Sequence, residues 1–350
     1  MPPVTVVILN WNGKHWLEQF LPSVMQSTYP DLHVLVMDNA STDDSVTFLQ
    51  AEYPDVQVEV LPENYGFTGG NNRALPYIET PYFVLLNSDV EVTPGWLEPL
   101  VALAESDPKI ASVQPKIKAH FDKALFEYAG ACGGFMDSLS YPFCRGRMFD
   151  DLEADMGQYD TSMDIFWASG ACCLLRTDVV QEIGLFEESF FAHMEEIDFC
   201  WRAKSFGYRV MVEPQSVVYH VGGGSLPKSN PKKTYLNIRN SLACMRKNLP
   251  DGQVFSKIFA RLILDGVWAF KSLLRGDFGT IGAIIKAHWH FFGKLGFWAK
   301  RRKEIYGPKG PQPIQTGVYP GSVVWQYFGK GVKKWGDLMG QPTREAVKES

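Results

Sequence analysis

Three carboxylates crowd into four residues of the chain, because Glu195, Glu196 and Asp198 stand together in the segment FFAHMEEIDFCWRAKSFGYRV. Aromatic and apolar residues flank them, and burying a carboxylate costs free energy unless something compensates. If the segment is helical, Glu195 and Asp198 share one face, while Glu196 projects about a quarter-turn away. Such a cluster could take a proton from a hydroxyl group. The alternative is a solvated helix start that pairs with the basic residues following it.

Polar residues also follow three predicted strands. Asn10, Asp38 and the pair Asn87/Asp89 each lie at or just past the C-terminal end of a β-branched, apolar run. In open α/β sheets, ligands bind outside these carboxyl ends. One such Asp would usually be a helix cap, but three strands that end in this way favour a binding cleft.

The elements that position these residues alternate along the first hundred residues. Continuous apolar strands separated by helical spacing predict a mostly parallel sheet that is covered on both faces. Residues 110–165 are predicted to form irregular loops with short strands, and residues 166–190 a strand and a helix. The predicted strands of the first hundred residues are 4–10, 32–41, 56–63 and 81–92, with helices at 14–27 and 43–53.

Composition and charge indicate a globular chain with two different regions. Of the 350 residues, 45% are hydrophobic and 21% are charged. Residues 1–225 carry a net charge of −20 and residues 226–350 a net charge of +15, which indicates different partners for the two parts. The six cysteines form no CxxC pair and no secretory signal is visible, so we expect reduced thiols and a cytoplasmic protein.

Six motifs occur in an order that resembles glycosyltransferase family 2, the GT-A-fold enzymes that use nucleotide-activated sugars. The rhamnosyl- and galactofuranosyl-type polysaccharide transferases of this family look most similar. The resemblance covers about residues 3–225 and implies a GT-A-like α/β domain over 1–225, followed by a basic, aromatic-rich helical region over 226–350. The motifs are VTVVILNWNG, VMDNASTDDS, ENYGFTGGNNRAL, LLNSDVEVTPGWL, SGACCLLRTDVVQEIGLFEESFFAHMEEIDFCWRAKSFGYRV and VVYHVGGGS.

The resemblance implies a divalent metal, Mg²⁺ or Mn²⁺, that neutralises the diphosphate of the donor. Asp89 and His220 are its implied ligands. Asn87 stands where relatives commonly carry Asp, so with Ser88 it would be a weaker or ribose-side contact. An Asx-type turn at 87–89 and a structural histidine are the alternatives.

Further nucleotide contacts are implied for Asn10, Asp38, Asn71 and Asn72. Asp38 would accept a hydrogen bond from the base or from a ribose hydroxyl, or hold an Asx turn, and both roles could coexist. The segment GFTGGNNRAL opens a predicted helix, whose N–H groups could meet an anion. Many relatives have Arg near the position of Asn71, which weakens a charge-based role for this loop.

For catalysis, the resemblance assigns Glu196 as the general base of an inverting transfer, which takes the proton of the acceptor hydroxyl. Glu195 and Asp198 are then predicted to bind the acceptor or to orient the base. Arg202 is available as a counter-charge. The acceptor side is predicted to comprise Trp167, Gly170 and Arg202, although Trp167 could instead be a core residue.

The sequence therefore predicts an inverting glycosyltransferase that uses a UDP- or dTDP-linked sugar. Its acceptor would be a glycan or lipid-linked glycan in cell-surface polysaccharide synthesis. A nicotinamide-dependent oxidoreductase would need G-x-G-x-x-G after the first strand, where NWNGKHW stands. The alternative is a non-catalytic GT-A-fold protein that binds carbohydrate or acts as a scaffold.

The basic region suits an anionic membrane surface, since Lys and Arg match headgroups while Trp and Phe match the interface. No nucleic-acid-binding motif accompanies the charge. We therefore expect a cytoplasmic protein that lies at the inner face of the cytoplasmic membrane. Alternatively, the amphipathic helices predicted from about residue 250 onward pack on the catalytic domain or in a homo-oligomer.

Overall fold

The computed structural model describes residues 1–222 and 230–340. The predicted domain boundary at residue 225, and most of the glycine-rich segment after His220, lie outside the described residues. No helix in the described ranges combines the length and apolar character needed to cross a membrane.

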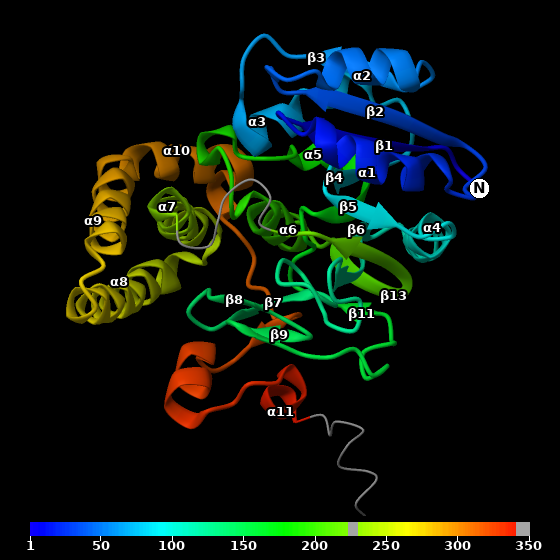
Figure 1. The fold of residues 1–350 in the computed structure, drawn as a ribbon. Helices are drawn as coiled ribbons and strands as arrows, with labels where there is room; N and C mark the ends of the chain where they lie inside the picture. Colours follow the sequence, from blue (N-terminus) through cyan, green and yellow to red (C-terminus); the bar gives the residue numbers. More distant parts are fainter. Residues whose placement is uncertain (223–229, 341–350) are drawn as a thin grey trace, which may run out of the picture.

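A nine-stranded mixed sheet forms the centre of the molecule (Figure 1). Its order is β11-β13-β6-β12-β4-β1-β2-β3, and β5 pairs with β13. Neighbouring pairs among β3, β2, β1 and β4 are parallel, and β12 runs antiparallel between β4 and β6. The strands are β1 (Val4–Asn10), β2 (Leu32–Asp38), β3 (Gln57–Val60), β4 (Tyr82–Asn87), β5 (Val90–Val92), β6 (Ile110–Ala119), β11 (Met163–Asp164), β12 (Cys172–Arg176) and β13 (Arg209–His220).

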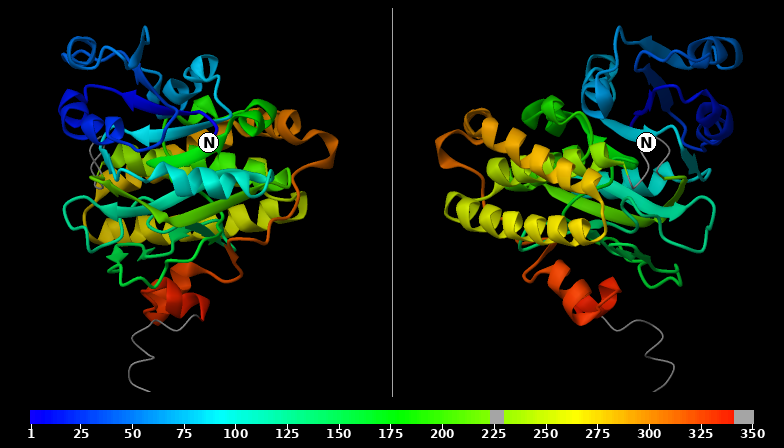
Figure 2. Two further views of the ribbon diagram at one scale, coloured as in Figure 1. Left: turned by 90° about the vertical axis from the view of Figure 1, so that its right-hand side faces the viewer. Right: turned by 60° about the vertical axis from the view of Figure 1, so that its left-hand side comes forward.

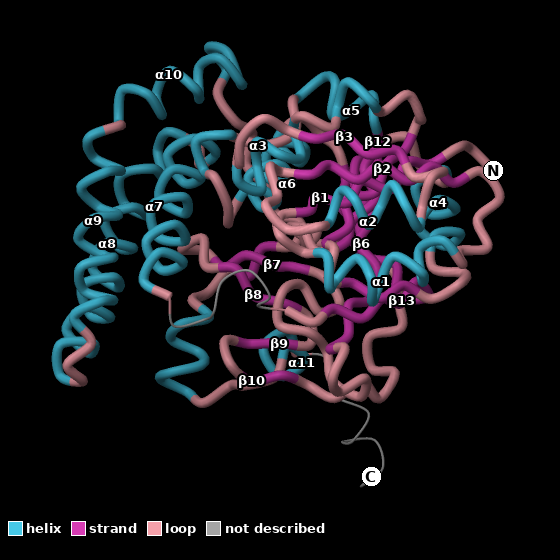
Figure 3. Tube along the Cα trace, turned by 45° about the horizontal axis from the view of Figure 1, so that its top comes forward, coloured by secondary structure: helices cyan, strands magenta, loops and turns pink. Residues whose placement is uncertain are grey.

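Both faces of the sheet are covered, as the continuous apolar strands predict. On one face Val6 and Ile8 of β1 belong to a cluster with α1, α2 and α4, and on the other Val7 joins a cluster with α5 and α6 (Figure 3). The predicted α/β fold with a mostly parallel sheet is confirmed. The helices are α1 (Lys14–Met25), α2 (Ser45–Glu52), α3 (Gly66–Asn72), α4 (Leu97–Glu105), α5 (Thr177–Ile183) and α6 (Glu195–Ser205), with short turns η1 (Leu75–Tyr77) and η2 (Glu188–Phe190).

The middle of the chain differs in part from the prediction. Residues 110–119 form β6, a long and largely buried strand, instead of irregular loops. Its buried polar residues, Ser112, Gln114 and Lys116, interrupt the apolar pattern by which a central strand is recognised. The predicted short strands do occur as a second sheet in the order β10-β9-β8-β7-β14. They are β7 (Gly134–Asp137), β8 (Pro142–Cys144), β9 (Arg147–Met148), β10 (Asp151–Leu152) and β14 (Val318–Tyr319).

The C-terminal region is helical at first, as predicted, and then returns to the small sheet. Its first four helices form a layer beside α6 (Figure 1). Strand β14 pairs with β7, and Trp335 is buried against Phe135 and Tyr159. The elements are α7 (Pro231–Asn248), α8 (Asp251–Leu274), α9 (Phe278–Gly293), α10 (Leu295–Tyr306), η3 (Gly307–Lys309), the π-helical turn η4 (Trp325–Gly329) and α11 (Trp335–Met339).

Candidate active site

The strand ends that the sequence singles out meet at one edge of the sheet. Asn10 of β1 pairs in register with Asp38 of β2, and Leu9 pairs with Asn87 of β4. The Asn10 amide donates a hydrogen bond of 3.0 Å to Asp38, whose other oxygen accepts the backbone N–H of Ser41 at 2.9 Å. Asp38 therefore holds a turn, the alternative considered for it, and its nucleotide contact stays a prediction. Asn10 Oδ1 is buried and has no partner among the described residues.

Asp89, in the turn between β4 and β5, meets His220 at the end of β13, which is far away in the sequence. Asp89 Oδ1 lies 3.2 Å from His220 Nε2, and both side chains are largely buried. On the other side of the ring, His220 Nδ1 lies 3.4 Å from a carboxylate oxygen of Glu127. Burial alone would lower the pKa of His220, but the two carboxylates raise it to about 10. The two carboxylates thus favour the protonated ring, and Nε2 would release its proton on binding a metal ion.

The donor atoms fit a divalent cation. Neighbouring ligands of an octahedral Mg²⁺, each at about 2.1 Å, are about 3 Å apart, close to the separation of Asp89 Oδ1 and His220 Nε2. A carboxylate behind the ligating histidine, as Glu127 is here, is the usual arrangement for orienting the ring. Burial raises the pKa of Asp89, yet the bond and charge of His220 bring it below its ordinary value, so this carboxylate is ionised. Within the described ranges, no group of three or more His, Cys, Asp or Glu residues forms a ready metal site.

The asparagines of α3 serve the local structure. Asn71 is buried and donates to the Phe67 carbonyl at 2.9 Å. The Asn72 amide donates to the carbonyl of Phe186 at 2.9 Å and accepts the N–H of the same residue at 3.0 Å. These bonds tie α3 to the chain before α6, and the nucleotide contact predicted for Asn72 stays a prediction. Asn71 is engaged within its own helix.

The predicted carboxylate helix is α6, in which Glu195 is buried and Glu196 is half-buried. Burial, followed by the neighbouring charge of Glu196, raises the pKa of Glu195 well above its ordinary value. Burial also raises the pKa of Glu196 to about 7. One carboxylate oxygen of each residue is buried with no hydrogen-bond partner in the described part of the chain. Two adjacent carboxyls therefore hold their protons differently near neutral pH, which is a pattern typical of acid–base sites.

Glu196 lies close to the NSD segment of residues 87–89. A Cβ built on Gly170 would be 3.9 Å from Glu196 Cβ, and the next residue, Ala171, accepts the N–H of Asn87 at 2.9 Å. The chain before β12 therefore bridges the start of α6 and the end of β4. Gly170 thus lies beside Glu196, and its predicted contact with the acceptor stays a prediction.

A strained segment leads into α6. Phe191, His193 and Met194 all have positive φ angles, between 67° and 73°, a conformation that non-glycine residues rarely adopt. Asn240 of α7 holds this segment, because its amide donates to the carbonyls of Phe190, Ala192 and His193. Sequence reasoning missed Asn240, since no local pattern links it to a segment almost fifty residues earlier.

Asp198 and Arg202 are buried and form hydrogen bonds within the protein. Asp198 is fully buried and accepts hydrogen bonds from Arg202 at 3.1 Å, Lys247 at 3.0 Å and Asn248 at 2.8 Å. The Arg202 guanidinium also donates to the carbonyls of residues 183–185. Burial raises the pKa of Asp198, but Lys247 and Arg202 together bring it below its ordinary value. Arg202 is the counter-charge of Asp198, and Asp198 with Lys247 and Asn248 joins α6 to α7, while the acceptor contacts of Asp198 and Arg202 stay predictions.

Trp167 is buried, which favours the core alternative considered for it over a place on the acceptor side. Its side chain is buried, its indole N–H donates to the Phe135 carbonyl at 3.0 Å, and its ring packs on Gly134. The small sheet covers the ring through Gly134 and Phe135, and contact of Trp167 with the acceptor stays an untested prediction.

The fold and this site define a class of protein. Polar side chains gather at the carboxyl edge of a mixed sheet with buried carboxylates at the start of α6, and solved GT-A glycosyltransferases share the fold. The crystal structure of GalNAc-T7 with UDP, GalNAc and Mn²⁺ matches with a TM-score of 0.56 at 16% identity, covering 71% of this chain and 48% of that one. The mannosyltransferase PcManGT from Pyrobaculum calidifontis, in complex with GDP-Man and Mn²⁺, matches with a TM-score of 0.52 at 15% identity, covering 83% and 87%.

The sequence profile of glycosyl transferase family 2 matches residues 5–184, and the chain belongs to this family. A relative is the N-acetylglucosaminyl-diphospho-decaprenol L-rhamnosyltransferase of Mycobacterium tuberculosis, 25% identical over 61% of this chain and 75% of that one. The O-antigen biosynthesis protein RfbC of Myxococcus xanthus is 24% identical over 67% of this chain, which spans only 18% of RfbC. The recognition from sequence motifs is confirmed, and the chain is a glycosyltransferase.

Proposed function

We propose that the protein is an inverting, metal-dependent glycosyltransferase that transfers a sugar from a UDP- or dTDP-linked donor to a glycan or lipid-linked glycan. The observation that carries the proposal is the carboxyl pair at the start of α6. Glu196, with a pKa of about 7, stands beside the chain that leads to the NSD segment, and Glu195 has its pKa raised further. A base that titrates near neutral pH is suited to take a proton from a hydroxyl group.

The donor would bind along the carboxyl edge of β1, β2 and β4. Asn10 presents an unpartnered oxygen there, and Ser88 and Asn87 are partly exposed beside it. A divalent metal, held by Asp89 and His220, would supply positive charge to the diphosphate leaving group. Mg²⁺ usually takes its remaining ligands from phosphate and water. Solved relatives of the same fold were crystallised with Mn²⁺ and nucleotides, which supports this assignment.

The reaction would be a single displacement. Glu196 accepts the proton of the acceptor hydroxyl while that oxygen bonds to the anomeric carbon, and the bond between this carbon and the diphosphate oxygen breaks. Because attack comes from the side opposite the leaving group, the anomeric configuration inverts. Glu195, kept neutral by burial, would donate a hydrogen bond instead of adding a second negative charge.

A lipid-linked acceptor is supported by the names of two relatives, one acting on a diphospho-decaprenol glycan and one in O-antigen biosynthesis. Such an acceptor would place the enzyme at the inner face of the cytoplasmic membrane. The six cysteines are all free and buried, which suits a reducing compartment.

The test is transfer by the purified full chain. It is incubated with UDP-, dTDP- and GDP-sugars and Mn²⁺ or Mg²⁺, and the released nucleoside diphosphate is measured with and without a lipid-diphosphate glycan. We expect turnover that depends on metal and on Asp89, lost in D89A, with an inverted anomeric signal by NMR. The E63Q variant, which removes an exposed carboxylate, is the control. Donor binding without any transfer or hydrolysis would favour the non-catalytic alternative.

A further inference from the structure

Helix α8 is oriented with its polar side inward. Arg261 and Asp265 are buried, and the two side chains form an ion pair at 3.4 Å. His288 of α9 approaches Asp265 at 3.0 Å, and Arg261 donates to the carbonyl of Ser140. The charged residues of α8 therefore serve as its anchor to the rest of the protein, which is the reverse of an ordinary amphipathic surface helix.

The outer side of α8 is an apolar stripe. Large apolar residues recur every three or four positions along it, so they share one side of the helix. The first of them, Phe255, is 83% exposed, and the last, Leu274, is 73% exposed. The exposed stripe consists of Phe255, Phe259, Ile263, Val267, Phe270 and Leu274.

Helix α9 continues this surface. Its inner side buries Ala283, Ile284, Ala287 and Phe291, yet its outer side is also apolar. Figure 2 shows α8 and α9 side by side as the outer layer of this flank, next to α7. The exposed residues of α9 are Phe278, Ile285, Trp289 and Phe292. Together with the stripe of α8 they are called the α8–α9 surface.

Basic residues accompany the apolar ones. Lys271, Arg275, Lys286 and Lys294 are exposed along these helices. Between residues 255 and 295 the acidic residues are Asp265, which is buried, and Asp277, which caps α9. The exposed charge of this flank is therefore mainly positive.

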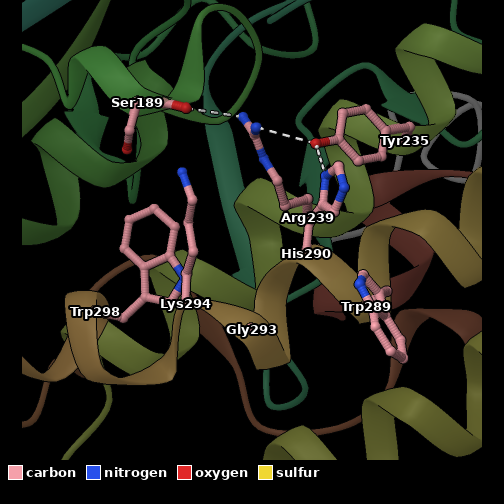
Figure 4. Close-up of a pocket in the computed structure, with 8 residues that line it drawn as sticks. All are labelled: Ser189, Tyr235, Arg239, Trp289, His290, Gly293, Lys294 and Trp298. Atoms are coloured by element: carbon pink, nitrogen blue, oxygen red, sulfur yellow. Dashed lines mark hydrogen bonds between the residues drawn. The ribbon is translucent and has the colours of Figure 1, made fainter.

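A cleft of about 430 Å³ opens next to this surface, between α7, η2 and the helices α9 and α10 (Figure 4). Trp289 and Lys294 both line it, so its walls include an aromatic ring and an ammonium group. Within the cleft, Arg239 and His290 meet at the hydroxyl of Tyr235. This combination of cations and aromatic rings suits a phosphate headgroup at the border of an apolar phase.

We propose that the α8–α9 surface lies in the headgroup region of an anionic lipid bilayer, with its apolar stripes inserted and its lysines on lipid phosphates. The inference rests on the proposed function in that a lipid-linked acceptor calls for a membrane. A second copy of the chain is a poorer occupant, because two such surfaces would bring basic residues against basic residues with few exposed carboxylates between them.

The experiment is co-sedimentation of the full chain with vesicles of phosphatidylcholine, with or without phosphatidylglycerol. We expect binding to the anionic vesicles that weakens in high salt. F255Q/F270Q should lower the partition coefficient about tenfold or more, since two inserted rings are lost. K271E/K286E should lower it about tenfold on anionic vesicles only. The control F121Q/M156Q removes two similarly exposed apolar side chains elsewhere and should bind as the native chain does.

Circular dichroism shows whether each variant folds. If F255Q/F270Q does not fold, the test rests on K271E/K286E. The proposal is overturned if the native chain does not bind anionic vesicles, or if both surface variants bind them as tightly as the native chain. It is also overturned if light scattering without lipid shows a dimer that F255Q/F270Q converts to monomer. Vesicle binding does not require catalysis. A chain that binds vesicles but is inactive would therefore contradict the proposed function and leave the membrane proposal standing.

Discussion

Replacing Glu196 by Gln should make the protein more stable above neutral pH while it removes activity. The native carboxyl has a pKa of about 7, against an ordinary value of 4.5, because burial disfavours its charged form. The native state therefore keeps this proton over a range in which the unfolded chain has released it. An uncharged amide of nearly the same shape avoids the cost of ionising a buried group.

The size of the effect follows from linkage. Raising a pKa from 4.5 to about 7 corresponds to about 3 kcal/mol of native-state destabilisation once the carboxyl is ionised. Because the folded-state pKa is raised, the protonated carboxyl of Glu196 favours the native state. This contribution to stability is fully present below pH 4.5 and is lost as the pH rises through 7. Because Glu196 is partly exposed, water relaxes some of the cost, and 3 kcal/mol is the upper bound.

Urea unfolding of the native chain and of E196Q at pH 4.5 and pH 8 measures this difference. The two should coincide at pH 4.5, and E196Q should be more stable by up to about 3 kcal/mol at pH 8. In parallel, native kcat/KM should fall tenfold per pH unit below about 7, and E196Q should lose about 10²- to 10⁴-fold in kcat. The variant E63Q controls for the loss of one exposed negative charge. Equal stability at pH 8, together with a pH profile that is flat through 7, would refute the reasoning.

The E127A variant removes the carboxylate behind His220, so the ring loses its orienting partner. We expect Mn²⁺ binding to weaken about 10- to 100-fold in a calorimetric titration, with partial recovery in E127Q. Unchanged affinity would count against a metal at His220. N240A leaves the carbonyls of Ala192 and His193 without the Asn240 donor, whereas Phe190 keeps Arg239, so we expect about 2 kcal/mol less stability in urea and a lower kcat at unchanged donor KM. A kcat equal to that of the native chain would show that the segment before α6 keeps its conformation without Asn240. W167F should cost less than about 1.5 kcal/mol and leave the acceptor KM unchanged, whereas a large rise in KM would restore Trp167 to the acceptor side.

The elements of the first hundred residues, and the positions of Asn10, Asp38 and Asp89 at strand ends, could be predicted because strand and helix periodicity depend on neighbouring residues. Strand β6 could not, since Gln114 and Lys116 are buried in it and obtain their partners from residues elsewhere in the chain. The order of the motifs carried enough information to recognise the family.

The candidate site also has features that the local sequence predicts and features that depend on distant contacts. That Glu195 and Glu196 open a helix is local information, and the sequence predicts it. That Asp198 is an anchor follows only from Lys247 and Asn248, which α7 brings to it from about fifty residues away. Glu127 was missed for the same reason, because no motif relates it to His220.

By itself, the sequence determined the alternation of strands and helices, the family and the carboxylates that could perform chemistry, because these features depend on residue type and short spacing. Only the tertiary structure decided which carboxylates are enclosed without a counter-charge and which are neutralised, since that depends on distant segments. It also decided the orientation of α8. Periodicity shows that a helix has an apolar and a polar side, but only the packing of Arg261 and Asp265 against the protein leaves the apolar side facing outward.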